Sequence, residues 1–301
     1  MKAQSPGPPP ERPFDHLPSG LVVDRYVIER PLADGGFSAV YLARRLEDMT
    51  QVVVKEYLPR RLAYRDWNGA VVPNDEDCRS AFLRGRKLFV AEAQMLATLK
   101  HPNIVEVNSF FHANATVYMV MSYDYGKLLS WHLKHRPRQL NAAFLRQLAL
   151  ALLSALECIH GHGFVHLDLK PENILIRPDG SPLLLDFGAA RPFPAATDWR
   201  RPGKVRTPGF SPPEQYGKHW PLGPWSDFYG LGATLRYCLE RRPLPEASRR
   251  LKQDSLTPLA TTSTGRHPPL FLEAIDRCLA LEPGKRPQTA AELRTLLASE
   301  R

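Results

Sequence analysis

The sequence predicts an α+β fold in which most strands precede most helices. Short runs rich in β-branched and aromatic residues before residue 124 are typical of strands. After residue 140, apolar residues recur at helical spacing, which indicates helices packed on a common core. The chain has 301 residues, of which 43% are apolar and 24% charged, as expected for a globular protein with ample core.

The expected elements follow from these patterns. Strands are expected at 26–28, 39–43, 52–55, 107–111 and 116–123. A helix is expected near 82–99, where Phe82, Phe89, Ala93, Leu96 and Leu99 share one helical face. A second long helix is expected from Asn141 until the Gly161–Gly163 break, with Leu145, Leu148, Leu152 and Leu156 on its buried face.

Composition narrows the classes of function. The formal net charge is +9, and nucleic-acid binding is one possible meaning of this charge. The basic residues are dispersed along the sequence, however, which argues against nucleic-acid binding. A surface that binds an anionic nucleotide or an acidic partner explains the charge about as well. No apolar run is expected to span a bilayer, and the N-terminus lacks the pattern of a signal peptide. The cysteines (Cys78, Cys158, Cys238 and Cys278) lack metal-ligand spacing and are expected to be reduced thiols. We therefore expect a cytoplasmic protein with no membrane contact.

Residues 1–20 are rich in proline and polar residues, which favours a disordered or extended leader. The folded part is expected to occupy residues 21–300.

The chemistry is concentrated between Phe164 and Gly188, written FVHLDLKPENILIRPDGSPLLLDFG. Asp168 could accept a proton from a substrate hydroxyl, and Lys170 could place a positive charge on a phosphate. Asn173 and Asp186 offer hard oxygen ligands of the kind that magnesium prefers. Each residue alone is better explained as an ordinary loop residue that hydrogen-bonds its own backbone. The ordered set instead indicates phosphoryl transfer.

This spacing, H-x-D-x-K-x-x-N followed by D-F-G, resembles the catalytic and metal loops of protein kinases. The sequence Lys55 to Pro59, KEYLP, narrows the resemblance to eukaryotic-like (Hanks-type) bacterial Ser/Thr kinases. The resemblance covers about 21–297 and implies a two-lobed kinase fold. The N-lobe (about 21–121) would be a five-stranded antiparallel sheet with a helix, the hinge would be 122–126, and the C-lobe (about 127–300) would be mainly helical. ATP and Mg²⁺, or Mn²⁺, would occupy the cleft.

The resemblance assigns the phosphate-binding residues of the first part. Gly35, Gly36, Phe37 and Ser38 would form the glycine-rich turn, in which Ala33 and Ser38 replace the outer glycines. Lys55 would neutralise the α- and β-phosphates and would pair with Glu92.

The resemblance also assigns the adenine site. Val40 and Val53 would lie above the ring, Leu175 below it, and Met121 at its back. Main-chain groups of Ser122 and Asp124 would hydrogen-bond its edge.

In the later part, Thr207 would hydrogen-bond Asp168 and Lys170, as in Ser/Thr kinases. Glu214 of the closing signature would pair with Arg286. Ser226 or Asp227 would cap a helix, and Asp227 would hold the catalytic loop.

One departure bears on regulation. Leu167 stands where kinases that are switched by activation-loop phosphorylation carry arginine, whose guanidinium binds the phosphate. We therefore expect activity to depend little on phosphorylation of Thr197 or Thr207. The segment from Ala189 to Arg206 is expected to be mobile.

The expected activity is ATP-dependent phosphorylation of serine and threonine hydroxyls in proteins, autophosphorylation included. A pseudokinase scaffold is the main alternative, favoured by the altered glycine turn, and a small-molecule kinase is the second. The unusually long stretch 56–86 suggests a surface for a regulatory protein partner.

Overall fold

The computed structural model describes residues 16–193, 206–217, 220–262 and 267–298. The predicted leader lies outside the described residues up to position 15, as does Thr197. By its internal contacts the chain divides into two units. Unit 1 comprises Met1–Gln94 and Val107–Tyr123, and unit 2 comprises Met95–Glu106 and Asp124–Arg301. The division within the predicted hinge falls after Tyr123.

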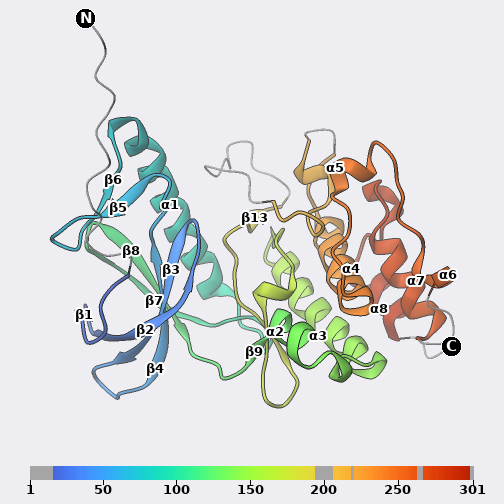
Figure 1. The fold of residues 1–301 in the computed structure, drawn as a ribbon, viewed down its shortest axis with the longest axis horizontal. Helices are drawn as coiled ribbons and strands as arrows, with labels where there is room; N and C mark the ends of the chain where they lie inside the picture. The colour runs from blue at the N-terminus through green and yellow to red at the C-terminus, as the bar shows by residue number, and fades with distance from the viewer. Residues whose placement is uncertain (1–15, 194–205, 218–219, 263–266, 299–301) are drawn as a thin grey trace, which may run out of the picture. The chain divides into compact units, whose positions relative to one another are not determined.

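Unit 1 is built on an antiparallel sheet with the strand order β1-β2-β3-β4-β8-β7 (Figure 1). Its strands are β1 (Val22–Val23), β2 (Tyr26–Asp34), β3 (Ser38–Arg45), β4 (Gln51–Tyr57), β7 (Val107–Ala113) and β8 (Thr116–Ser122). The sheet thus has one strand more than the expected five. The extra strand, β1, has only two residues, which is too short for a pattern of alternation to reveal it.

The stretch after β4 folds into regular structure that the sequence did not indicate. A hairpin, β5 (Ala63–Arg65) with β6 (Val71–Pro73), precedes the helix α1 (Glu76–Thr98). The helix begins six residues before its expected start at Phe82. Asp75 explains the difference, because its Oδ1 accepts a hydrogen bond of 2.7 Å from the backbone N–H of Cys78 and so caps the first turn.

Unit 2 is mainly helical. Its helices are α2 (Leu129–His135), α3 (Ala142–Gly161), α4 (Pro224–Glu240), α5 (Ala247–Arg250), α6 (Leu259–Thr262), α7 (Pro269–Cys278) and α8 (Ala290–Ala298). Short strands are β9 (Lys127–Leu128), β10 (Phe164–Val165), β11 (Ile174–Ile176), β12 (Pro182–Leu184) and β13 (Arg191–Pro192). Turns of 3₁₀ helix cover Pro137–Gln139, Pro171–Asn173, Pro213–Gln215 and Pro283–Lys285. Of the segment 189–206 that was predicted to be mobile, residues 194–205 lie outside the described residues, and the described part contains the strand β13, which pairs with β10.

The long helix α3 corrects one expectation. By length and composition alone this helix could span a membrane, although no apolar run in the sequence was expected to do so. Its apolar residues lie instead in the core of unit 2, where α3 contacts α4 and α8. Asn141 caps its start, since its Oδ1 accepts a 2.9 Å hydrogen bond from the N–H of Phe144.

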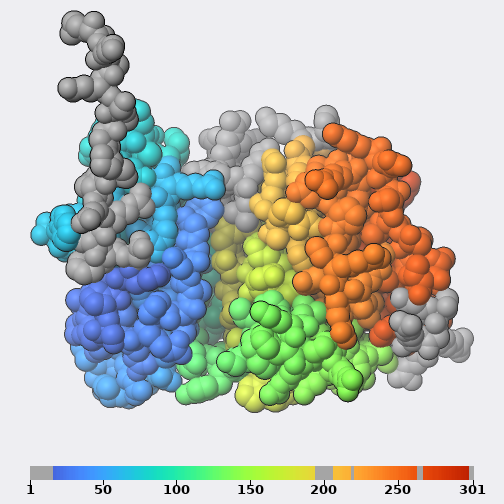
Figure 2. Space-filling view, viewed as in Figure 1, coloured from blue at the N-terminus to red at the C-terminus, as the bar shows by residue number. Residues whose placement is uncertain are grey.

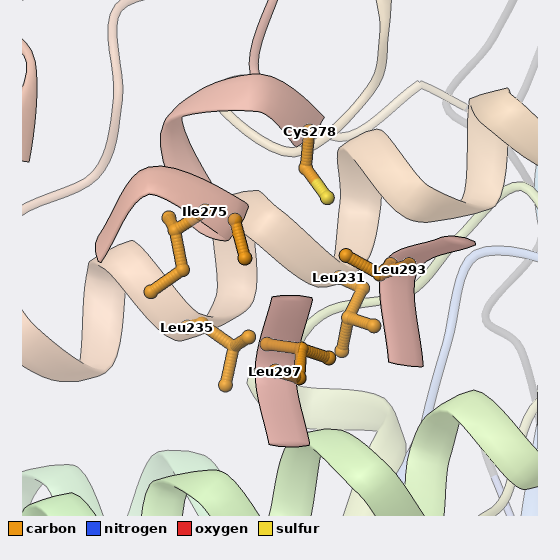
Figure 3. Close-up of a pocket in the computed structure, with 7 residues that line it drawn as sticks. Leu231, Leu235, Ile275, Cys278, Leu293 and Leu297 are labelled. Carbon is orange, nitrogen blue, oxygen red and sulfur yellow. The ribbon is translucent and has the colours of Figure 1, made fainter. Parts of the chain in front are cut away.

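The core of unit 2 contains a small apolar pocket where α4, α7 and α8 meet. Figure 3 shows its lining, which consists of Leu231, Leu235, Ala274, Ile275, Cys278, Leu293 and Leu297. These side chains offer no charge or strong hydrogen-bonding group to a phosphate, so the pocket belongs to the packing of the core. In the space-filling view, the visible surface of unit 2 includes the α2 and α3 region (green) and the segment after α4 (orange), with yellow residues between them (Figure 2).

Candidate active site

In unit 1, Lys55 and Glu92 form an ion pair. Lys55 on β4 donates from Nζ to Oε1 of Glu92 on α1 over 3.1 Å. Their side chains are 11% and 4% exposed, respectively. A buried pair of this kind holds the lysine head in one place, although the free side chain has many rotamers. The structure therefore brings together the two residues whose pairing the sequence predicts.

The glycine-rich turn connects β2 and β3 in unit 1. The backbone N–H of Gly35 donates to the carbonyl of Ser38 over 2.9 Å, which closes the turn. Gly36 has nothing within 4 Å of the position that a Cβ would occupy, so this backbone is open to an approaching ligand. Phe37 is 50% exposed at the tip. Exposed N–H groups on a turn of this kind suit a phosphate.

The predicted adenine-site residues of unit 1 lie on adjacent strands. Val40 of β3 is opposite Lys55 of β4, and Val53 of β4 is opposite Met121 of β8. Met121 is buried, and the hydroxyl of Ser122 donates to the side chain of Asn108 over 3.2 Å.

The other two adenine-site residues belong to unit 2. Asp124 accepts a 2.6 Å hydrogen bond from Nε of Arg177, so its carboxylate is already engaged and only its main chain suits the predicted role. Leu175 is half-buried on β11, between Leu128 and Leu183 in the register of the small sheet.

In unit 2, a network of hydrogen bonds surrounds Asp168. Thr207 donates from its hydroxyl to Oδ1 of Asp168 over 2.6 Å. Lys170 donates to Oδ2 over 2.7 Å and to the Thr207 hydroxyl over 3.1 Å. Asn173 donates from Nδ2 to the same Oδ2 over 2.9 Å. Both carboxylate oxygens thus accept hydrogen bonds, which fixes the orientation of the group.

The candidate metal ligands Asn173 and Asp186 also belong to unit 2. The backbone N–H of Leu185 donates to the carbonyl of Asn173 over 3.0 Å, which brings the start of the Asp186 loop next to Asn173. Asp186 accepts a 3.0 Å hydrogen bond from the N–H of Gly188. In the part of the chain that the structure describes, no three His, Cys, Asp or Glu side chains form a metal cluster. Two oxygen ligands fit Mg²⁺ well, because Mg²⁺ usually completes its shell with water and substrate phosphates.

The loop that carries Asp168 is anchored from beneath by Asp227 of α4. The two carboxylate oxygens of Asp227 accept hydrogen bonds from the backbone N–H groups of His166 and Leu167, over 2.8 and 2.7 Å. Asp227 is buried and also contacts Nε2 of His160 at 2.8 Å. This is the role that the resemblance implies. Of the two residues predicted to cap α4 (Pro224–Glu240), Ser226 takes part, because its Oγ accepts a 3.2 Å hydrogen bond from the backbone N–H of Gly223, the residue that precedes the helix.

Leu167 takes a strained backbone conformation, with φ at +65°. Two hydrogen bonds hold the backbone of Leu167 in this conformation. Its carbonyl accepts a 3.1 Å hydrogen bond from Nε2 of Gln215, and its N–H donates to Oδ1 of Asp227. The side chain is buried with Val165 and Ala189, and Phe193 and Leu222 pack against this cluster. The guanidinium of an arginine at this position would lie among apolar side chains, whereas a leucine packs with them.

His166 is fully buried below the same loop. Its Nδ1 accepts a 3.2 Å hydrogen bond from the backbone N–H of Asp168, and its ring lies edge-on to Phe187 at 4.7 Å between centroids. Burial lowers the pKa of the imidazole, and this effect outweighs the opposing effect of Asp227, Asp168 and Asp186. The neutral ring is therefore the form that supports the loop.

Sequence reasoning missed a buried polar network beside Lys55. Glu56 is fully buried and accepts hydrogen bonds from Tyr41 (3.0 Å), Tyr118 (2.7 Å) and Arg65 (2.6 Å). Arg65 belongs to the β5 strand of the insertion. The only sequence signal is an acidic residue within an otherwise apolar strand. Part of the stretch 56–86 is therefore core rather than free surface.

The fold of each unit and the residues that it positions define a protein kinase. The model of the family described as "Protein kinase domain" matches residues 26–296, and the chain belongs to this family. A solved structure titled "PpkA-294 apo form" matches with a TM-score of 0.84 and 34% identity, over 94% of this chain and 100% of that chain.

Several bacterial relatives carry the serine/threonine-protein kinase name, and two of them show the extent of the match. Kinase D of Synechocystis sp. is 28% identical over 92% of this chain and 52% of its own length. Kinase pkn3 of Myxococcus xanthus is 30% identical over 92% of this chain and 50% of its own length. The chain therefore spans about half the length of these relatives. The Hanks-type assignment from the sequence is confirmed.

Proposed function

We propose that this chain is an active kinase that transfers the γ-phosphate of ATP to serine and threonine hydroxyls of proteins, its own included. The observation that carries the proposal is the Asp168 network, in which Thr207, Lys170 and Asn173 orient one carboxylate. Family membership and the names of its relatives support the same activity.

In this proposal Asp168 orients the substrate hydroxyl and takes its proton. The hydroxyl oxygen forms a bond to the γ-phosphorus, and the bond from that phosphorus to the β-phosphate oxygen breaks. Lys170 reduces the negative charge on the transferred group, and Lys55, fixed by Glu92, neutralises the phosphates that remain. Mg²⁺ or Mn²⁺, held through Asn173 and Asp186, would supply further charge neutralisation when bound.

The test is transfer of radiolabel from γ-labelled ATP to a generic basic protein, followed by identification of the labelled amino acids. We expect labelled phosphoserine and phosphothreonine, and no label with Asp168→Ala. Label only on small molecules would favour a small-molecule kinase.

The second candidate is a pseudokinase scaffold, which the altered glycine turn favours, since Ala33 and Ser38 replace two glycines. A Cβ at these positions narrows the range of φ angles. Such a protein would bind ATP without transferring phosphate. Nucleotide binding measured together with the transfer assay separates these two candidates.

We also propose a regulatory protein partner for the outer part of the stretch 56–86, and a cytoplasmic location. Trp67, between β5 and β6, is 71% exposed, and a large exposed aromatic residue is typical of binding surfaces. All four cysteines are free, which suits a reducing compartment. Hydrogen exchange of this stretch with and without cell-derived partners tests the first proposal, since unchanged exchange would exclude it.

A further inference from the structure

One face of β4 contacts one face of α1 at two places along the helix, through Lys55 and through Tyr57. Lys55 and Tyr57 are two residues apart on β4 and therefore point to the same side of the sheet. Four residues of α1 lie on one helical face because three or four positions separate each from the next. They are Phe82, Gly85, Phe89 and Glu92. Lys55 meets Glu92 at one level, and Nζ of Lys55 also lies 5.8 Å from the centre of the Phe89 ring.

Tyr57 makes the contact at the other level. Its ring centre lies 5.5 Å from that of Phe82 and 5.7 Å from that of Phe89. Its hydroxyl donates a 3.2 Å hydrogen bond to the carbonyl of Phe82. Tyr57 is 5% exposed, and burial raises the pKa of its hydroxyl, so it remains a neutral donor.

Gly85 makes room for this tyrosine. A Cβ built on Gly85 would lie 2.0 Å from Oη and 2.9 Å from Cζ of Tyr57, distances that real Cβ atoms do not show. A helix interior ordinarily disfavours glycine by about 1 kcal/mol relative to alanine. Close approach of the tyrosine ring is therefore the physical reason for a glycine in the middle of α1.

The strand cannot easily yield to a larger residue at this position. Thr116 donates from its hydroxyl to the carbonyl of Tyr57 over 2.5 Å. Glu56, on the opposite face of β4, is held by three donors. With β4 fixed on both sides and the tyrosine ring enclosed by Phe82 and Phe89, added volume at Gly85 pushes the helix.

We propose that Tyr57 and Gly85 are positioning residues that set the register of α1 on β4, so that Glu92 meets Lys55. The inference rests on the proposed kinase activity only for its effect on catalysis. Glu92 lies seven positions after Gly85, about 10 Å along the helix axis. A displacement at Gly85 is therefore transmitted along a rigid helix to the ion pair.

The direct test measures the ion pair without using activity. Reductive methylation with formaldehyde, quantified by mass spectrometry of the Lys55 peptide, reports how accessible the amine is. We expect slow labelling of Lys55 in the wild type and labelling about tenfold faster in Gly85→Ala, as for a lysine released from a buried pair. Gly161→Ala is the matched control. Gly161 also lies in a helix and has nothing within 4 Å of its added Cβ, so labelling should not change.

A second variant keeps the proposal testable if Gly85→Ala folds poorly. Tyr57→Phe removes Oη, the atom nearest the added Cβ, so Gly85→Ala/Tyr57→Phe should label Lys55 more slowly than Gly85→Ala alone. Tyr57→Phe alone should change little, because the ring and its packing remain. This rescue distinguishes positioning from a general loss of stability.

The third test measures the kinetics of phosphate transfer. We expect Gly85→Ala to lower kcat for phosphate transfer by about 10- to 100-fold with a smaller change in KM for the protein substrate. Glu92→Gln should cost much less in the Gly85→Ala background than in the wild type, because the pair is already disrupted. Wild-type labelling rates and kcat in Gly85→Ala would overturn the proposal. A wild-type chain that transfers no phosphate would refute the proposed function alone, since the labelling experiment would still decide this inference.

Discussion

The carboxylate of Glu214 and the guanidinium of Arg286 form a two-point ion pair in which neither side chain is exposed to solvent. The distances are 2.7 Å (Oε1 to Nη1) and 3.0 Å (Oε2 to Nη2). Arg286 also donates to the carbonyls of Ala280, Leu281 and Trp225. The pair joins residues 72 positions apart and fixes the segment that carries Thr207 within unit 2.

Removal of Arg286 should destabilise unit 2 strongly, because it leaves a buried carboxylate without its partner. We expect Arg286→Met to lower the free energy of unfolding by about 3–5 kcal/mol. The exposed pair Arg294–Glu157 gives a matched control, and Arg294→Met should cost at most about 1 kcal/mol. Urea unfolding followed by circular dichroism checks both values. Equal losses in the two variants would show that burial does not decide the effect.

The buried pair Arg65–Glu56 should behave similarly in unit 1. Its side chains are 2% and 0% exposed, and Arg65→Met would leave Glu56 with only the two tyrosine hydroxyls. We expect a loss of about 3–5 kcal/mol. Arg79, which pairs with Glu76 on the exposed first turn of α1, is the control, and Arg79→Met should cost less than about 1 kcal/mol. A stability of Arg65→Met close to that of the control would contradict the structural role of the insertion.

Acid should destabilise the chain through His166. Its pKa in the folded state is lowered from the ordinary value of 6.5, so the unfolded state takes up the proton first as the pH falls. The contribution to stability is complete above about pH 6.5 and decreases below it, by up to about 1.4 kcal/mol at pH 5.5. The measurement is the urea midpoint at several pH values for the wild type and His166→Gln. His101 and His132, whose pKa values burial also lowers, contribute to both curves. Parallel curves for the two proteins would refute this role for His166.

The Leu167 cluster should make activity independent of activation-segment phosphorylation. Phosphatase treatment of the purified chain should leave the transfer rate unchanged, because the buried leucine offers no charge to a phosphate. Leu167→Ala should instead lower the free energy of unfolding by about 2–5 kcal/mol, the usual cost of a cavity in a packed cluster. Loss of activity after phosphatase treatment would contradict this account.

The parts of the site that follow one another closely in the sequence were the most predictable. Asp168, Lys170 and Asn173 lie within six residues, so their spacing alone indicates a common loop. Lys55 and Glu92 were predictable through the resemblance, because a strand lysine and a helix glutamate have no sequence signal of their own. The pair Glu214–Arg286 was predictable for the same reason.

What the sequence did not indicate depends on packing across elements. Gly85 looks like a weak point in a helical pattern until the ring of Tyr57 is seen next to it. Glu56 looks exposed until three donors from β3, β5 and β8 converge on it. The two-residue strand β1 is too short to alternate, and the early start of α1 depends on a single capping aspartate. Local patterns carry no information on contacts of this kind.

The steady-state rate of phosphate transfer in Lys55→Met and Asp186→Asn tests the central claim most directly. If these two side chains act on the triphosphate and its metal, each variant should lose about 3–5 kcal/mol of transition-state stabilisation, which is a fall of roughly 10²- to 10⁴-fold in kcat/KM. Gly161→Ala should retain the wild-type rate. Rates for Lys55→Met and Asp186→Asn equal to the wild type would contradict the account.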